Sequence, residues 1–413
     1  MINDYKQIGK NSIDINVWIL GLLALVLLIP STGQVQKYLG IYGVFVYLLL
    51  GTIAILVHYK YVWPVYFSKV TQRRAIWLAV ITFLILIAVF TVVYPIANSG
   101  VVGGGSDRDE ALNISVRELL RGKYPYSSKT YLDSPISPLP GSLLLSIPFV
   151  VLGNSAYQNI FWLIAFFVSV AWYFEDMRKA LLLLWTILIL SPVILQQFVT
   201  GGDLLSNCLY VLLFSWLTIV LVSKRGVSSW KKIVSSILLG IALSSRANFI
   251  LIVPLVFSII LKEIGWKWTI ISCALTFMSF SLVTVPFYLY EPESFSPLHT
   301  VNKLGIYQTV LPYSGVVIPI VSGILAIALS FQRMDFTKFL RNCTAVQALP
   351  FLSCIVLSTV QTGSLSFYFD GYGLFFLFFG VLSFWIILSK NVAIIPAGNR
   401  RNRGCVLKKQ SRK

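Results

Sequence analysis

Long apolar segments separated by short polar ones dominate this chain, and their lengths predict an all-α membrane protein. A helix needs about 20 apolar residues to cross a bilayer. The predicted spans cover residues 16–32, 40–58, 75–97, 156–174, 181–196, 204–222, 233–245, 249–261, 266–290, 313–331, 345–360 and 372–388. The pattern therefore predicts a polytopic transmembrane protein with about twelve spans. The pair 233–245 and 249–261 is short, and one long broken helix is the alternative there.

One further apolar segment, residues 141–152, is predicted not to cross. It lies between Pro140 and Gly153, and its length of about 12 residues is typical of a re-entrant or interfacial segment. If it did cross, the basic cluster that starts with Lys224 and Arg225 would fall outside the cell, against the bias of basic loops toward the cytoplasm. Counted as non-crossing, it leaves the basic loops and both termini in the cytoplasm.

The composition excludes a water-soluble globule. Of the 413 residues, 57% are hydrophobic and the mean hydropathy is +0.81, so polar side chains cannot cover the surface. Lysine and arginine number 33 against 15 acidic residues, a formal charge of +18. The bases lie between apolar segments and in the C-terminal tail, as in a multi-pass cell-membrane protein. None of the basic runs has the interleaved aromatic residues of a nucleic-acid site, so no nucleic-acid partner is expected.

Cysteine and histidine usage gives no indication of disulfides or metal centres. The five cysteines show no Cys-x-x-Cys pairing, so no disulfide and no metal cluster is predicted. The two histidines, His58 and His299, are too few for a histidine metal site. No cofactor is predicted from the residues.

The first apolar segment lacks a small-residue cleavage site and is expected to be a retained anchor.

The loop of residues 98–140 holds the highest concentration of acidic groups and turn residues. It follows a span that starts from a basic loop, so it is expected on the extracytoplasmic side. Acidic residues come first, at Asp107, Asp109 and Glu110, and apolar residues then recur at helical spacing, at Leu112, Val116, Leu119 and Leu120. This pattern predicts an amphipathic juxtamembrane helix that lies along the bilayer surface.

Two roles compete for the acids of this loop. Asp107 and Glu110 have the spacing of a capping box, in which the two side chains bind backbone amides at the start of a helix, and that could be their full role. Asp109 lies outside the capping pattern. A carboxylate held just above the membrane can also act as a general base, which is worth about 10²- to 10⁴-fold in rate. Downstream, Gly122 is expected to end the helix, and the prolines of residues 134–141 are expected to stiffen the loop.

These residues resemble a known family. The acids of residues 107–110, a helix ending in Leu-Leu-Arg-Gly-Lys-Tyr-Pro-Tyr, and Pro-Leu-Pro-Gly before an apolar half-helix look like the first external loop of the GT-C superfamily of integral membrane glycosyltransferases. Three further pieces resemble the same family: Leu190-Ser191-Pro192 with Gly201-Gly202-Asp203, residues 239–243 with Arg246-Ala247-Asn248, and Val285-Pro286-Phe287. The resemblance covers residues 75–290 and is most specific in the first loop.

The resemblance implies a GT-C-like fold, a polyprenyl-phosphate-linked sugar as donor, and an acid of the first external loop as general base. On this chain that acid is Asp107 or Asp109, because the helix allows either register. Some members of the family need a divalent ion, for which this sequence shows no ligand set. The hairpin ahead of residue 75 is an addition to the family pattern, so nothing is carried over to it.

Transfer from a lipid phosphate releases a phosphate anion, so cations are expected at the headgroup level. Arg246 stands out because apolar segments flank it. The other basic candidates are Arg108, Arg117, Arg121 and Lys123. Arg117 and Arg121 have the simpler role of contacting lipid phosphates without catalysis, and Asp203 that of capping the next helix. The remaining candidate substrate-binding residues are Glu110, Tyr126, Asp203, His299 and Lys303.

The chain is predicted to divide into an N-terminal hairpin with its cytoplasmic loop (1–74), a catalytic membrane core (75–290), a second external loop with the last spans (291–389) and a basic tail (390–413). Its predicted activity is transfer of a sugar, with inversion, to a glycan, lipid or protein acceptor outside the cytoplasm. One alternative is a transporter or lipid flippase, which should place ionisable groups inside its spans. The other is a non-enzymatic scaffold, in which the acids only cap a helix.

Overall fold

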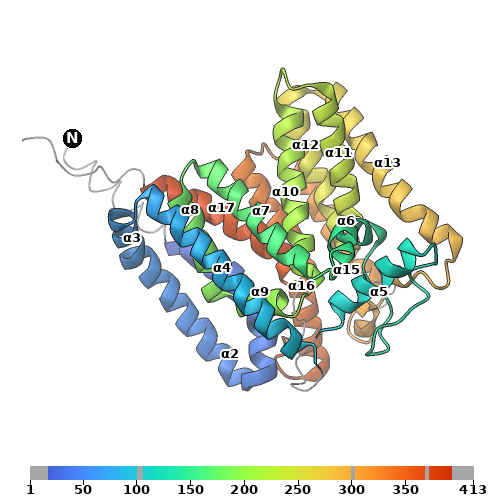
Figure 1. Cartoon of the computed structure of the whole chain (residues 1–413), viewed down its shortest axis with the longest axis horizontal. Coiled ribbons are helices and arrows are strands. Elements are labelled where there is room, and N and C mark those ends of the chain that lie inside the picture. The colour runs from blue at the N-terminus through green and yellow to red at the C-terminus, as the bar shows by residue number, and fades with distance from the viewer. Residues whose placement is uncertain (1–16, 100–105, 299–302, 368–371, 393–413) are drawn as a thin grey trace, which may run out of the picture.

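The computed structural model describes residues 17–99, 106–298, 303–367 and 372–392, and this part of the chain is built from helices (Figure 1). Apart from one isolated β-bridge between Lys129 and Pro135, no strand occurs in the described residues. The predicted all-α class is confirmed.

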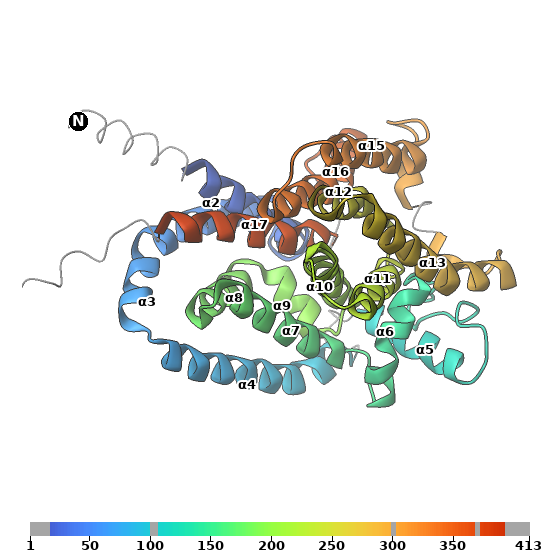
Figure 2. The same ribbon diagram turned by 90° about the horizontal axis from the view of Figure 1, so that it is seen from above.

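The N-terminal helices lie along one side of the molecule. Its helical run Val17–Lys69 includes η1 (Ile29–Ser31), α2 (Thr32–Val57), the π-helical η2 (His58–Val62) and α3 (Trp63–Lys69), and α4 (Gln72–Ala97) follows. Gly40 leaves the helical region with φ 68° and ψ −174°, a conformation that glycine adopts without strain. The helical run is therefore kinked at Gly40. Figure 2 shows α2, α3 and α4 curving round α8 and α9.

A small separate layer follows α4. It consists of α5 (Arg108–Leu120), an irregular loop and α6 (Pro140–Val151). A separate buried cluster holds it together; its members are Ala111, Leu112, Val116, Tyr126, Ile136, Leu139, Leu143, Val150 and Phe295. The apolar face of α5 is therefore mostly buried in protein, whereas Leu120 is 54% exposed. Only the C-terminal end of this helix presents an apolar side chain that a bilayer could cover.

The other helices form a bundle around α10. In chain order they are α7 (Tyr157–Phe174), α8 (Met177–Leu190), α9 (Pro192–Val199), α10 (Asp203–Ser223), α11 (Ser229–Leu243), η3 (Ala247–Ile252), α12 (Val253–Ile264), α13 (Trp266–Tyr290), η4 (Ser296–Leu298), η5 (Gly305–Tyr307), α15 (Ser314–Ser330), α16 (Phe336–Thr362) and α17 (Leu374–Val392). The central α10 packs against α7, α11, α12 and α17.

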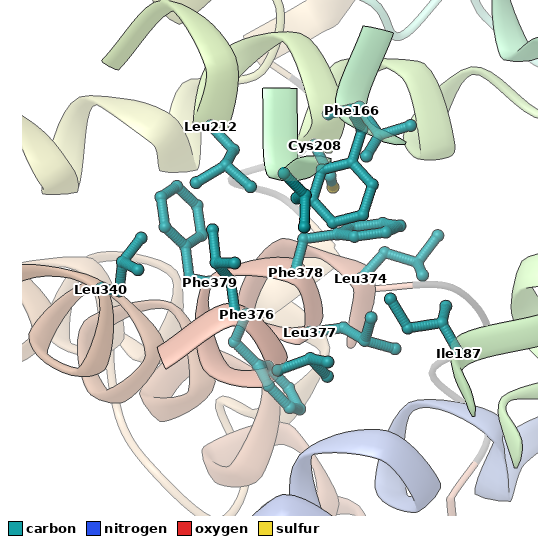
Figure 3. Packing of buried hydrophobic residues seen from close by; sticks show 14 of the residues in the cluster. Phe166, Ile187, Cys208, Leu212, Leu340, Leu374, Phe376, Leu377, Phe378 and Phe379 are labelled. Carbon is teal, nitrogen blue, oxygen red and sulfur yellow. The ribbon is translucent and has the colours of Figure 1, made fainter. Parts of the chain in front are cut away.

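Aromatic side chains fill the contact between α17 and the bundle. Figure 3 shows Phe378 and Phe379 of α17 extending toward α7 and α10, on the side where Phe166 and Leu212 lie. The rings of Phe166 and Phe378 are 5.4 Å apart. The main buried cluster extends from Leu20 to Leu388. It thus contains residues of all three membrane segments that the sequence analysis separated.

Within the described residues, seven helices are long and apolar enough to cross a membrane, or eight if the bent pair α8 and α9 counts as one span. The predicted membrane character is confirmed, but this count is lower than the prediction of about twelve. The first two predicted spans belong to one helical run, and α8 meets α9 at an angle of 88°. In addition, α11 and α15 have 15 and 17 residues, which is short for a crossing.

Candidate active site

Asp107 and Glu110 do not form the predicted capping box. Asp107 directly precedes α5, but its side chain makes no capping hydrogen bond. Its Oδ2 accepts a hydrogen bond of 2.8 Å from the Thr130 hydroxyl, and Glu110 Oε2 accepts one of 2.9 Å from the backbone N–H of Tyr131. The loop after α5 folds back over the start of the helix, so its donors replace the helix amides. The predicted end of α5 is confirmed, with Gly122 at φ 72°.

A polar hollow of about 300 Å³ lies between this loop and the start of η3. Asp107 lines it together with the basic residues Arg108, Arg246 and Lys303. The rest of the lining consists of Ala111, Thr130, Ser134, Pro135, Ser137, Pro138, Leu204 and Tyr372. The fold thus brings together an acid and three cations that the sequence indicated as separate candidates.

A buried ion pair holds Arg246 in the wall of this hollow. One terminal nitrogen of its guanidinium donates to Asp203 Oδ2, and the other donates to the Ser137 hydroxyl at 3.1 Å. Asp203 is fully buried, and the Asn207 amide also donates to its Oδ2, at 3.0 Å. Loss of either charge would leave the other buried and uncompensated, so the pair fixes the position of Arg246.

The predicted capping role of Asp203 is wrong. The residue before α10 is Gly202, and Asp203 is the first residue inside the helix. Its carboxylate is used by Arg246 and Asn207 instead of by the helix amides. The reason is tertiary: the turn at Arg246 packs against the start of α10, and a guanidinium is a stronger partner for a carboxylate than a backbone amide is.

Asp109 does not line the polar hollow. Its side chain is buried, and its Oδ2 accepts a hydrogen bond of 2.5 Å from the Tyr94 hydroxyl on α4. Burial raises the pKa of this carboxyl from 3.8 to about 6, and the Tyr94 hydrogen bond opposes part of the rise. Of the two candidate bases, Asp107 is the one in contact with the hollow.

Three basic side chains contribute to the described wall of the hollow, those of Arg108, Arg246 and Lys303. Arg108 donates to Gln197 Oε1 at 3.2 Å, and its guanidinium lies 5.9 Å from the centre of the Tyr372 ring. Lys303 is exposed. Among the described lining residues, Arg246 is paired with Asp203, and Asp107 is the acid. Basic side chains at this wall can bind an anionic group.

A second hollow, of about 290 Å³, shares Ser137, Arg246, Lys303 and Tyr372 with the first. Its other walls are mostly apolar and come from the loop before α6, η3, the segment around η4 and η5, α16 and α17; they are Leu139, Ala247, Asn248, Pro297, Leu304, Ile306, Gln347, Pro350, Phe351, Cys354 and Phe375. Arg246 thus borders a polar and an apolar chamber at once.

Two other predicted site residues, Tyr126 and Glu110, are described by the structure and do not line the polar hollow. Tyr126 is buried and donates to the carbonyl of Pro138 at 3.0 Å, so it braces the loop. Glu110 accepts a hydrogen bond from the backbone N–H of Tyr131 in the same loop. His299 lies outside the described residues.

Sequence reasoning missed four residues that hold or line the site: Thr130, Ser137, Gln197 and Tyr372. Threonine, serine, glutamine and tyrosine in loops and at helix ends are common, so none of these residues carries a signal alone. The prolines on both sides of Ser137 mark a rigid backbone and are the one local hint. Only the fold shows that the four converge on the acid and the bases.

Within the described residues, no three His, Cys, Asp or Glu side chains gather as a metal site would require. A scan against protein-family models, a search of curated proteins and a search of solved structures each find no match to this chain. The chemistry of the site therefore rests on its own geometry.

Proposed function

We propose that this chain is an integral membrane glycosyltransferase of the GT-C type, which moves a sugar from a polyprenyl-phosphate donor to an acceptor hydroxyl with inversion. The observation that carries the proposal is the pair of hollows that share Arg246 and Lys303. One hollow is polar and has a carboxylate in its wall, and the other is mostly apolar. An amphiphile with a phosphate between a sugar and a hydrocarbon chain matches this division.

The donor phosphate binds at the boundary between the two hollows, against Arg246 and Lys303. Its hydrocarbon chain lies in the apolar hollow, where Phe351 and Phe375 form part of the wall. The ion pair with Asp203 orients the guanidinium before the donor arrives. Preorganised cations stabilise charge that develops on a leaving group without reorganising in the reaction step.

In the transfer step, Asp107 takes the proton of the acceptor hydroxyl as the hydroxyl oxygen attacks the anomeric carbon. The bond between that carbon and the phosphate oxygen breaks, and the polyprenyl phosphate leaves with the bonding electrons. Attack from the face opposite the phosphate inverts the anomeric centre. Thr130 holds the carboxylate through Oδ2, which keeps Asp107 at the wall of the hollow.

The proposal includes a GT-C-like arrangement in the bilayer with about twelve crossings. The helical run Val17–Lys69 then crosses twice, with its bend at Gly40. The bent pair of α8 and α9 counts as one crossing, and the short helices α11, α15 and α17 as one each. Both termini lie in the cytoplasm of a cell-membrane protein, and the polar hollow opens on the other side.

The main alternative is a transporter or lipid flippase. Transporters commonly place ionisable groups near the middle of their spans. Here Asp203 begins α10 and Arg246 precedes η3, so the buried pair lies at helix ends, which favours an interfacial site of group transfer.

The test uses membranes that contain the full chain, incubated with a panel of synthetic polyprenyl-phosphate sugars labelled in the sugar. Transfer of label from at least one donor to an endogenous acceptor supports the proposal. Purified chain should also bind undecaprenyl phosphate and not undecaprenol, which lacks the phosphate. Binding without transfer from any donor would favour a flippase, and the absence of both would contradict the proposal.

A further inference from the structure

Four polar side chains form a cluster next to the proposed site without lining either hollow: Tyr94, Asp109, Asn113 and Asn154. We call them the Tyr94 cluster. The Tyr94 hydroxyl is its centre, since it donates to Asp109 Oδ2 at 2.5 Å and accepts from Asn154 Nδ2 at 2.6 Å. The ring of Tyr94 stacks on Phe90 of α4 at 4.8 Å. The hydroxyl is therefore held at a fixed point at the end of α4.

Asn113 repeats the attachment one turn later on α5. Its amide nitrogen donates to Asn154 Oδ1 at 3.1 Å, and its oxygen accepts from the backbone N–H of Ser155 at 2.8 Å. The Ser155 hydroxyl donates in turn to the backbone carbonyl of Asp109, at 3.1 Å. Two successive turns of α5 are thus bound to the turn between α6 and α7, and the first of them is also bound to α4.

The turn between α9 and α10 closes around the same cluster. Gly201 has φ 72°, and a Cβ atom added there would lie 2.9 Å from Tyr94 Cε2 and 3.1 Å from the Cβ of Asp109. Both the backbone conformation and the space require glycine. Shortly after Gly201 the chain reaches Asp203, which holds Arg246. Shortly before Asp109 it carries Asp107.

We propose that the Tyr94 cluster is a positioning device that holds Asp107 and Arg246 in register across the polar hollow, with Asp109 as a positioning residue and not as the base. The inference rests on the function proposed above. The cluster fixes Asp109 and Gly201. Asp109 lies two residues after Asp107, and Gly201 lies two residues before Asp203, which holds Arg246. Precision of this kind matters, because a displacement of about 1 Å at a reacting group can cost about 10²-fold in rate.

Asp109 gives the cluster a dependence on pH. The hydrogen bond from Tyr94 on α4 lowers the pKa of this carboxyl, and the charge of Glu110 on its own helix raises it. Tyr131, from the loop after α5, is a further titratable group that interacts electrostatically with Asp109. The neighbouring turns contribute Ser155 and Gly201, which do not titrate in this range. Burial is the largest effect and brings the pKa to about 6. The ionised carboxylate is the stronger acceptor for the Tyr94 hydroxyl, so the cluster is tightest above this pH.

The variants Tyr94→Phe and Asp109→Asn separate positioning from catalysis. The control is Glu118→Gln, near the C-terminal end of α5, which lines neither hollow and pairs with Arg121 and Lys123. Tyr94→Phe removes the central hydroxyl, so kcat should fall about 10-fold or more, and the acid limb of the pH–rate profile should move to higher pH. Asp109→Asn keeps an acceptor for Tyr94, so it should retain transfer within about 10-fold of the wild type and lose the limb near pH 6. Glu118→Gln should match the wild type.

Hydrogen exchange of the purified full chain gives a readout that does not need transfer. In Tyr94→Phe, the backbone amides around Asp107 and those around Asp203 should both exchange faster, while those of α13 stay as in the wild type. Unchanged exchange around both acids would overturn the proposal, as would an Asp109→Asn variant that is as inactive as Asp107→Asn at every pH. If the wild type transfers no sugar at all, the proposed function fails, and the exchange result still decides whether the cluster holds the two segments.

Discussion

Asp107 and Arg246 face one polar hollow and are held there by different partners, Thr130 and Asp203. In the described residues they form no ion pair with each other. Each is the residue directly before a helix, Asp107 before α5 and Arg246 before η3. Because Thr130 holds Asp107 and Asp203 holds Arg246, the space between the carboxylate and the guanidinium is left for a reacting molecule.

The ion pair between Asp203 and Arg246 should control both folding and activity. In Arg246→Gln the carboxylate of Asp203 stays buried without its partner, which costs about 3–5 kcal/mol of stability. The double variant Arg246→Gln with Asp203→Asn removes both charges and should recover most of this loss, but it should not recover transfer. Thermal unfolding in detergent and sugar transfer in membranes measure the two effects. A double variant with normal transfer would show that the guanidinium has no role in the reaction.

The apolar hollow should bind the hydrocarbon chain of the donor. Cys354→Trp fills part of this hollow and should raise the KM for a polyprenyl-phosphate sugar about 10-fold or more, because each methylene displaced from an apolar contact loses about 0.8 kcal/mol. Val356→Trp is the matched control, since Val356 lies on the same helix but is 60% exposed. Equal donor affinity in the two variants would mean that the chain binds elsewhere.

Asp109 should make the stability of the folded chain depend on pH. Its pKa in the folded protein, about 6, is above the ordinary value of 3.8, so the folded state binds this proton more tightly than the unfolded state does. Stability from this group is therefore present at low pH and is lost as the pH rises between the two values, by on the order of 2–3 kcal/mol.

Asp109→Asn removes that loss. Relative to the wild type, the variant should gain thermal stability at pH 7.5 and not at pH 4, as unfolding in detergent would show. Asp133→Asn is the control, because the side chain of Asp133 is 81% exposed. A gain for Asp109→Asn that is the same at both pH values would indicate that the carboxyl does not titrate in this range.

The topology predicts that the loop after α5 is extracytoplasmic and that the loop before α11 is cytoplasmic. Ser128→Cys and Ser228→Cys are a matched pair for this test, one in each loop. In a background without reactive native cysteines, a membrane-impermeant maleimide should label the first variant in intact cells and the second only after lysis. The reverse order would place the polar hollow in the cytoplasm.

The helical, membrane-embedded class was predictable because apolar length determines it, and no tertiary contact is needed to see an apolar run. The connections between runs were not predictable in the same way. The bend at Gly40 depends on one backbone conformation, and α8 and α9 divide at Pro192, which the sequence analysis placed inside a single span. A proline permits either a kink or a break, and only the packing of the neighbouring helices decides between them.

The residues of the site were identified singly but not paired. Asp203 and Arg246 were both candidates, yet nothing in one sequence indicates that they bind each other. The capping-box alternative for Asp107 and Glu110 is wrong for a related reason, because their spacing is a local signal. Thr130 and Tyr131 replace the helix amides only after the loop has folded back. The burial of Asp109 likewise depends on α4 and on the turn at Gly201.

The most direct test of the account is sugar transfer from a labelled polyprenyl-phosphate sugar in membranes that contain wild-type chain, Asp107→Asn or Glu118→Gln at equal folded amounts. Loss of a general base should reduce transfer about 10²- to 10⁴-fold in Asp107→Asn and leave the binding of undecaprenyl phosphate within a few-fold of the wild type. Glu118→Gln should behave as the wild type. Transfer by Asp107→Asn at the wild-type rate would contradict the account.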